Sequence, residues 1–427
     1  MFARLIYRAI WRWHFWSGLI ITPVFLVVCV TGALYVFEPE IRRWQNPERH
    51  FIDPNARAAP NALEAFVSAS REQLPDYYLR YINVPCEPEL AWEGIAQLES
   101  ADGSRHTLFT YFDPAQMKWL GTHDNRVGFF AVVLQLHRNL MLGLPGRILV
   151  ETATCWGIIS LLAGIYLWWP RKKEKFWGVW APRWRGRLRK VLRDWHNVPS
   201  FYLAPVSIVL LVSGLLFTQI WGLAYRSINL VTGGFPDYFL NPPTSSTAAD
   251  GSTRISVDTA LLRAEQYFDF SNTDYSIEVP KPGSDAAFLV ITDTGKPLKP
   301  MHLVFLDQFS GETLLYHDSS GVPLRTRITL LFYPVHVGSI FGLPTKVLAL
   351  LSSIVLAVGA ITGVWMWWVR RAPGSWGTPR PANKPLNTPA LTTFVVVLAI
   401  LLPTVGLTLL LIMGYEFLKH RLQPITA

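Results

Sequence analysis

Cysteine is scarce in this sequence, and its few copies stand far apart. The 427 residues include three, Cys29, Cys86 and Cys155, with no CxxC or CxxCH motif among them. That pattern excludes covalent attachment of a c-type heme and disfavours a zinc or iron–sulfur site held by cysteines. A glycine-rich nucleotide loop, an HExxH motif, a catalytic triad and a convincing pair of carboxylates are missing as well. The common soluble-enzyme chemistries therefore have no signature in this chain.

Charged residues are also few. They make up 16% of the chain, against 50% hydrophobic residues and a mean hydropathy of +0.24, which is a composition typical of a membrane protein. The net charge is +9, but the basic residues cluster beside apolar runs instead of covering a soluble surface. The clusters are Arg4, Arg8 and Arg12, "RKKEK" at 171–175, "RWRGRLRK" at 183–190, and Arg370 with Arg371. This positive-inside pattern indicates membrane topology, so we expect a lipid bilayer and no nucleic acid as a partner.

Five apolar runs are long enough to cross a membrane as helices. They lie near residues 16–37, 147–169, 200–221, 345–368 and 391–415. The first run is too long for a signal-peptide core and lacks a small-x-small cleavage site, so we expect it to be retained. The basic clusters place the N-terminus in the cytoplasm, and 38–146 and 222–344 in the periplasm. The fifth helix would exit on the periplasmic side too.

The two periplasmic segments have soluble compositions. In the first, an amphipathic helix at 62–74 precedes strand-like stretches such as "HTLFTYFDP". In the second, Ser256 is the predicted N-cap of a helix in "SVDTALLRAEQYF", and alternating runs such as "MHLVFLDQFSGETLL" follow. The expected fold is an integral membrane α-helical bundle with two periplasmic α+β domains.

The expected organisation follows from these segments. Its parts are the cytoplasmic N-terminus and first span (1–37), a first periplasmic domain (38–126), an interfacial helix with the second span, basic loop and third span (127–221), a second periplasmic domain (222–324), an interfacial helix with the fourth span (325–371), a cytoplasmic linker (372–389), and the fifth span with the tail (390–427).

A repeat relates the spanning helices. "WHFWSGLIITPVFLVVCVTG" at Trp13–Gly32 matches "WHNVPSFYLAPVSIVLLVSG" at Trp195–Gly214, with a proline nine and a glycine eighteen residues after the histidine. Residues 136–172 match 335–371 without a gap, from a histidine through "GLP" to a "WW" pair. Because both halves begin in the cytoplasm, we expect two parallel repeats of two spanning helices, related by an axis along the membrane normal, plus a fifth helix.

Four of the ten histidines, His14, His137, His196 and His336, occupy equivalent places in the repeat. A two-fold axis would bring His14 to His196 near the cytoplasmic surface and His137 to His336 near the periplasmic surface. Two facing imidazoles in an apolar bundle suit a heme, which takes one nitrogen on each face. We therefore expect two b-type hemes with bis-histidine ligation.

Cations near these histidines suit the propionates of the two hemes. Arg147 and Lys346 each lie ten residues after their histidine and are candidates at the outer heme. Arg8 and Lys190, each six residues before theirs, are weaker candidates at the inner heme. The other histidines lie in the soluble segments and the tail without ligand-like spacing, and we expect them to be surface or domain residues.

Glycines in the spanning helices are candidates for room beside the porphyrins. Gly32 and Gly214 lie eighteen residues beyond the inner histidines, about 27 Å along a helix, which is near the depth of the outer heme. We expect Gly164 and Gly363 to make the same space at the inner heme.

Structural roles and other functions of these residues remain open. A histidine at a membrane interface often anchors the helix, and glycine is common where membrane helices pack. The same four histidines also suit a proton relay or a metal transport path. Transport is disfavoured because the spans hold almost no carboxylates, with Glu151 as the main exception.

Several of these motifs together resemble the PepSY-associated transmembrane family of bacterial inner-membrane proteins, often linked to iron uptake. The matching features are the "WH…TG" first helix, "LHRNLMLG", the helix end "G-x-Y-L-W-W-P-R", and "SVDTALLRAEQYF…LDQFSGETL", over about residues 1–371. The first soluble segment departs from the family, because it carries only a weak PepSY pattern. The resemblance implies a multi-pass protein of the inner membrane with PepSY-like periplasmic domains.

The family includes ferric-siderophore reductases that hold two b-type hemes. The resemblance therefore implies that His14, His137, His196 and His336 are axial ligands. It also implies a ferric siderophore or other periplasmic ferric chelate as electron acceptor, and a cytoplasmic or membrane donor such as a flavoprotein or quinol. The alternatives are a heme-free membrane protein that binds ligands or regulates a periplasmic peptidase, and a di-heme reductase with a non-iron acceptor.

Overall fold

The computed structural model describes residues 2–169, 176–246, 253–292, 301–318, 320, 322–372, 374, 393, 397 and 402–422. The chain forms two compact units, each assembled from segments distant in sequence. The helical unit comprises Met1–Val36, Val132–Arg226 and Val335–Ala427, and the sheet unit comprises Phe37–Ala131 and Ser227–Pro334. The "RKKEK" cluster and most of the linker expected at 372–389 lie outside the described residues.

Four helices of the helical unit are long and apolar enough to cross a membrane. They are α1 (Phe2–Tyr35), α6 (Gly143–Trp168), α7 (Leu188–Leu215) and α12 (Leu343–Arg370). Each contains most of one of the first four apolar runs. The prediction of four helices in these places that are long and apolar enough to span a membrane is confirmed.

The third span ends earlier than expected, at Leu215 instead of near residue 221. The chain turns and starts α8 (Ile220–Val231). The buried carboxylate of Glu151 stabilises this break, because it accepts hydrogen bonds of 2.8 Å from the amides of Ile220 and Trp221. Amides in the first turn of a helix have no partner within the helix, and an acidic group there satisfies them. Glu151 therefore has a structural role.

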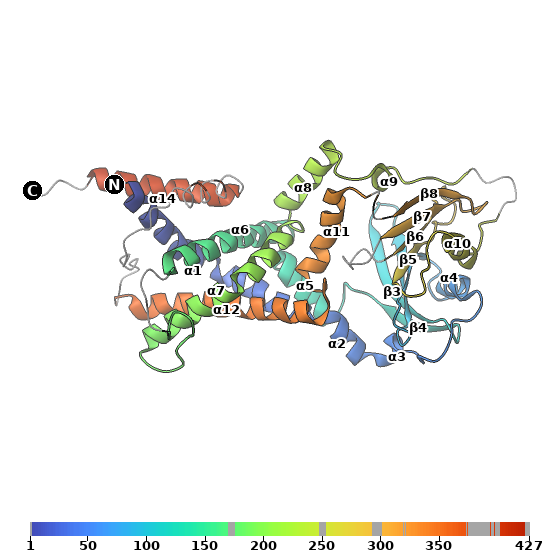
Figure 1. The fold of residues 1–427 in the computed structure, drawn as a ribbon, viewed down its shortest axis with the longest axis horizontal. Coiled ribbons are helices and arrows are strands. Elements are labelled where there is room, and N and C mark those ends of the chain that lie inside the picture. The colour runs from blue at the N-terminus through green and yellow to red at the C-terminus, as the bar shows by residue number, and fades with distance from the viewer. Residues whose placement is uncertain are drawn as a thin grey trace, which may run out of the picture. The chain divides into compact units, whose positions relative to one another are not determined.

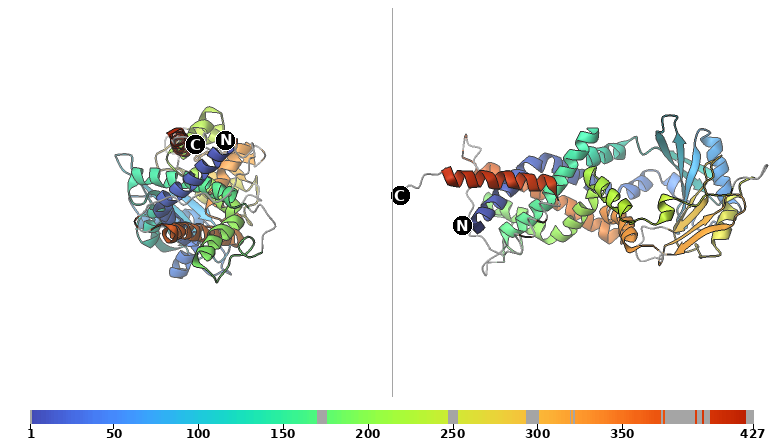
Figure 2. Two further views of the ribbon diagram at one scale, coloured as in Figure 1. Left: turned by 90° about the vertical axis from the view of Figure 1, so that its left-hand side faces the viewer. Right: turned by 90° about the horizontal axis from the view of Figure 1, so that it is seen from above.

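The four long helices run side by side (Figures 1 and 2). Helix α1 packs against α6 and α12, and α7 packs against the same two helices. Helices α1 and α7 thus occupy one diagonal of a four-helix bundle, and α6 and α12 occupy the other. The diagonal pairs are the pairs that match in sequence.

A further helix, α14 (Pro403–Leu422), packs on α1 and α6. Val405 and Leu409 join the apolar core of the bundle, and the indole Nε1 of Trp13 donates a hydrogen bond of 3.1 Å to Thr408 Oγ1. The fifth span was expected at 391–415, and most of its first half lies outside the described residues. Within the described part of the chain, four helices, not five, meet the length and hydropathy of a span.

The sheet unit contains one antiparallel sheet in the order β4-β3-β2-β1-β5-β6-β7-β8. Its strands are β1 (Tyr78–Val84), β2 (Trp92–Glu99), β3 (Arg105–Asp113), β4 (Lys118–His123), β5 (Tyr275–Glu278), β6 (Phe288–Thr292), β7 (His302–Leu306) and β8 (Thr313–Asp318). The shorter helices are α2 (Glu38–Gln45), α3 (Pro47–His50), α4 (Ala62–Gln73), α5 (Phe129–Asn139), α9 (Asp237–Leu240), α10 (Val257–Ala264) and α11 (Leu324–His336).

The two soluble segments, expected as separate domains, share this sheet. Each contributes a helix followed by a four-stranded meander, and the first strands, β1 and β5, pair antiparallel with Ile82 opposite Ile277. A lone meander would leave the edge of its first strand unpaired. Pairing the two edges satisfies both backbones and joins two small cores into one, which explains why the segments merge.

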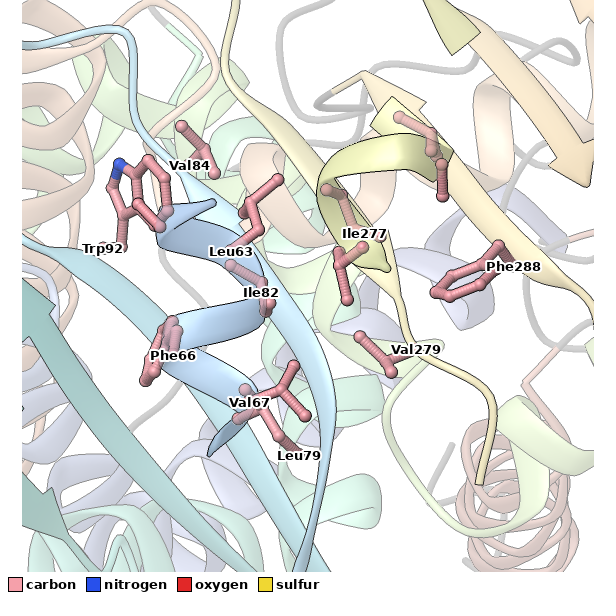
Figure 3. Packing of buried hydrophobic residues seen from close by; sticks show 14 of the residues in the cluster. Leu63, Phe66, Val67, Leu79, Ile82, Val84, Trp92, Ile277, Val279 and Phe288 are labelled. Carbon is pink, nitrogen blue, oxygen red and sulfur yellow. The ribbon is translucent and has the colours of Figure 1, made fainter. Parts of the chain in front are cut away.

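The shared core lies where α4 and α10 pack against the sheet. Its buried residues come from both segments, and Phe66, Ile277 and Phe288 have no exposed surface. Figure 3 shows Leu63 and Phe66 of α4 beside β1 residues such as Ile82.

The two helices also cap each other. Asp258 of α10 accepts hydrogen bonds from the amides of Leu63 and Glu64 at the start of α4, at 3.2 and 2.9 Å. Glu64 in turn accepts one of 2.8 Å from the amide of Val257 at the start of α10. The predicted N-cap, Ser256, accepts a hydrogen bond of 3.1 Å from the amide of Thr259. Each segment therefore completes a helix end of the other.

Candidate functional site

The four repeated histidines meet as two pairs. His14 of α1 and His196 of α7 have ring centroids 6.3 Å apart, with the rings inclined by 79°. His137 of α5 and His336 of α11 have centroids 6.1 Å apart, inclined by 46°. These are the partners that the repeat predicts, and we call them the inner pair and the outer pair.

The separation within each pair fits a metal ion between the rings. A metal–imidazole bond is about 2 Å long, and the centre of a five-membered ring with bonds of about 1.33 Å lies roughly 1.1 Å behind its nitrogen. One metal ion bound between two imidazoles therefore places the ring centroids roughly 6 Å apart. Both pairs have this spacing.

Backbone carbonyls orient three of the four rings through Nδ1. The acceptor is the oxygen of Val28 for His137, of Leu210 for His336 and of Gly359 for His196, at 3.0, 3.0 and 2.8 Å. A carbonyl oxygen only accepts, so Nδ1 carries the proton and Nε2 keeps its lone pair. Metal-bound histidines are commonly oriented by such a bond at the other nitrogen. Among the described residues, the hydrogen bonds of these rings all involve Nδ1, which leaves Nε2 available to a metal.

The fourth ring departs from this pattern. The Nδ1 atom of His14 is buried without a hydrogen-bond partner. The carbonyl of Ser160 lies near the ring, but outside the geometry of a hydrogen bond. Ser160 occupies the matching place, since Val28, Leu210, Gly359 and Ser160 each lie four residues before one of the repeated glycines.

The repeated glycines lie against the histidine rings. A Cβ atom on Gly32 would stand 3.1 Å from His137 Cε1, and one on Gly214 would stand 2.7 Å from His336 Cε1. At the inner pair, Gly164 and Gly363 approach His14 and His196 in the same way, at 3.2 Å each. In each case the group nearest to the glycine is an imidazole ring. The expectation that these glycines make room for a porphyrin stays a prediction.

A cavity of about 360 Å³ lies beside the inner pair. Small residues such as Gly18 and Gly157 open it, and His14 and His196 lie in its wall. An apolar cleft with a few convergent polar groups is typical of a cofactor site.

The cations at the inner cavity are not those expected. Arg193 and Arg370 line it, whereas the sequence suggested Arg8 and Lys190, which are exposed elsewhere on α1 and α7. Arg193 lies three residues before His196, about one helical turn away. A pattern shared by both halves could not reveal it, because the first half has no arginine at the matching position.

At the outer pair, Arg147 lies close to the histidines. Its Nη2 donates a hydrogen bond of 3.3 Å to the carbonyl of Phe217, whose ring packs on His336 with centroids 5.6 Å apart. Lys346 lies in the first turn of α12, at the matching position, and is partly exposed.

Five further histidines lie in the sheet unit and contact its own residues. His50 packs on Tyr111, His106 bonds Asp124, His123 contacts Arg42, His302 stacks on Phe268, and His317 packs on Tyr238. These contacts lie within the sheet unit, and the sequence predicted that these histidines are surface or domain residues.

Comparison with known proteins gives the family. No curated protein matches the chain significantly. The sequence profile of the family described as PepSY-associated TM region matches residues 11–370, which include all four repeated histidines. The match covers most of the chain, and the protein therefore belongs to the PepSY-associated TM region family.

Proposed function

We propose that this protein is a di-heme electron-transfer protein of the bacterial inner membrane that reduces a periplasmic ferric chelate, most simply a ferric siderophore, for iron acquisition. The observation that carries the proposal is the pairing of four histidines at metal-bridging distance, with Nε2 left available by the Nδ1 bond in three of the rings. The family includes proteins with this chemistry, and the resemblance supplies the choice of acceptor.

The two pairs lie at different levels of the bundle. Gly32, against His137, is eighteen residues beyond His14 on the same helix, which is about 27 Å of rise. The hydrocarbon core of a bilayer is about 30 Å thick. Two sites at these levels divide a crossing that is too long for one electron step.

The chain's own groups would hold and orient the hemes. The four histidines would provide nitrogen ligands to the heme irons, the Nδ1 bonds hold three of the rings, and the glycines let the rings approach the helices. Arg193 and Arg370, which line the inner cavity, are our candidates to bind propionates there, and Arg147 and Lys346 are the candidates at the outer site. When bound, heme supplies a one-electron couple whose potential the protein tunes.

The direction of transfer follows from topology, which we propose on the basis of the basic clusters. They assign the inner pair to the cytoplasmic side and the sheet unit to the periplasm. We further propose that the two halves of the bundle are parallel repeats. The matched diagonals of the bundle and the matched histidine contacts support this.

A ferric chelate suits the acceptor because one electron changes its stability. Siderophores bind Fe(III) through hard oxygen ligands, and reduction to Fe(II) lowers the affinity of those ligands, so that iron is released. Glu151, the main carboxylate within the spans, is occupied by the amides of α8, which weakens the alternative of proton or metal transport.

The test begins with the visible spectrum and the heme content of the purified protein. We expect two b-type hemes per chain. His14→Ala or His196→Ala is expected to leave the outer heme alone, and His137→Ala or His336→Ala the inner one. His106→Ala, in the sheet unit, is the matched control and retains both.

Function is then tested by adding a ferric siderophore to the reduced protein without oxygen, with a ferrous indicator present. We expect reoxidation of the hemes and trapping of Fe(II), lost in His137→Ala while the inner heme stays reducible. A protein without heme contradicts the proposal. Hemes that ignore every ferric chelate but reduce another periplasmic acceptor contradict only its iron part.

A further inference from the structure

Hydroxyl groups add a second acceptor to three of the four histidines. Thr31 Oγ1 lies 3.3 Å from His137 Nδ1, Ser213 Oγ lies 3.4 Å from His336 Nδ1, and Thr362 Oγ1 lies 3.5 Å from His196 Nδ1. Each hydroxyl residue directly precedes the glycine that touches the same ring.

These hydroxyls face the rings with a lone pair. Thr31 donates its own hydrogen to Val27 O at 2.6 Å, Thr362 donates to Val358 O at 2.6 Å, and Ser213 donates to Leu210 O at 3.0 Å. Such back-bonding along the helix uses the single hydroxyl proton. The oxygen then accepts from the imidazole Nδ1–H alongside the backbone carbonyl.

The fourth position lacks the hydroxyl. Ala163 precedes Gly164, which touches His14, and it is buried. His14 therefore has no hydroxyl acceptor, and its Nδ1 also lacks the carbonyl bond that orients the other three rings. The outer pair has two fully bonded rings, whereas the inner pair has one.

A hydrogen bond from Nδ1–H makes the opposite nitrogen a stronger donor to a metal. A stronger donor stabilises ferric over ferrous iron and lowers the reduction potential of a heme. Nearby cations do not separate the two sites, because Arg193 and Arg370 line the inner cavity, where Arg193 is paired with Asp194, and Arg147 lies at the outer pair.

We propose that unequal hydrogen bonding of the four imidazoles gives the inner heme the higher reduction potential of the two, and that Ala163 sets part of the difference. This inference rests on the proposed function, because it concerns the hemes assigned there. With such a difference, electrons from the donor would rest at the inner site until the acceptor withdrew an electron at the outer site.

The test replaces Ala163 by threonine and, as a matched control, by valine. Threonine restores the hydroxyl found at the other three positions, and valine has nearly the same shape without it. Redox titration of the full-length protein, followed by visible spectra, gives both midpoints, and His14→Ala identifies the inner heme. We expect Ala163→Thr to lower the inner midpoint relative to Ala163→Val and to leave the outer one unchanged.

A second substitution, at the outer pair, tests the inference without changing the packing around residue 163. Thr31→Val removes a hydroxyl at constant shape, and we expect it to raise the outer midpoint alone. Equal inner midpoints in the threonine and valine variants, or a lower inner than outer midpoint in the unchanged protein, would overturn the inference while two bound hemes still support the proposed function. Absence of heme would instead overturn the proposed function, and this inference with it.

Discussion

The proposed site depends on close contacts between single glycines and the imidazole rings. Each of the four histidines touches a glycine of another helix through Cε1. A side chain there would push the ring away from the position that its Nδ1 bond defines. Glycine lowers helix stability relative to alanine, and the contact with the ring is a reason for its presence at these positions.

Gly214→Ala tests this contact. The added Cβ would stand 2.7 Å from His336 Cε1, closer than side-chain atoms normally approach, so the ring must move. We expect heme content to fall from two toward one per chain, with loss of the outer heme, measured by absorbance against protein concentration.

Gly414→Ala is the matched control for that substitution. Gly414 also lies in an apolar helix, α14, but a Cβ on it would meet nothing within 4 Å, and it does not line the cavity beside the inner pair. It is expected to keep both hemes. Equal loss in the two variants would show that glycine serves helix packing in general and not the histidine contact.

Helices α4 and α10 cap each other's first turns. Asp258→Ala removes the acceptor for two amides at the start of α4. Loss of such a cap costs about 1–2 kcal/mol, so amide hydrogen exchange in α4 is expected to become about tenfold faster. Glu89→Ala, at an exposed site of the same unit, is the control and leaves exchange unchanged.

The turn between β7 and β8 gives a pH dependence. Burial would raise the pKa of Asp307, but hydrogen bonds from the amides of Ser246, Ser310 and Phe309 outweigh it and hold this pKa below its usual value. A carboxylate with a lowered folded pKa stabilises the fold above its unfolded pKa, and this contribution is lost as pH falls through the folded pKa.

Asp307→Asn is therefore expected to lower thermal stability at pH 7, where the carboxylate is charged, by the equivalent of about 1–3 kcal/mol. The difference from the unchanged protein is expected to narrow as pH falls below about 4. Unfolding midpoints at pH 7 and pH 3 measure this. A gap that stays constant between the two would mean that the charge of Asp307 does not contribute.

The topology of the whole chain is constrained by the shared sheet. The soluble segments share one sheet through the pairing of β1 with β5, so both must lie on the same side of the membrane. Reporter fusions after residues 100 and 290 are expected to read periplasmic, and those after 180 and 380 cytoplasmic. Opposite readings at 100 and 290 would contradict both the shared sheet and the parallel repeat.

Much of this architecture could be predicted from the sequence alone. The apolar runs, the basic clusters and the internal repeat are properties of the order of residues, so they determined the four spanning helices and the pairing of His14 with His196 and of His137 with His336. Each of these histidines has an equivalent in the other half of the sequence, and this equivalence alone predicts which two histidines pair. The helix and strand character of the soluble segments is local in the same sense.

The contacts between these parts, namely strand pairing, hydrogen bonds to the imidazole rings and helix packing, are set by the tertiary structure alone. The union of two meanders depends on the pairing of edge strands nearly two hundred residues apart, which no local pattern records. The bonds of Nδ1 depend on backbone carbonyls, which every residue has. Helix length sets the level at which each repeated glycine lies, whereas packing sets its neighbour, which is an imidazole in each case. The early end of α7 likewise needed Glu151 of another helix.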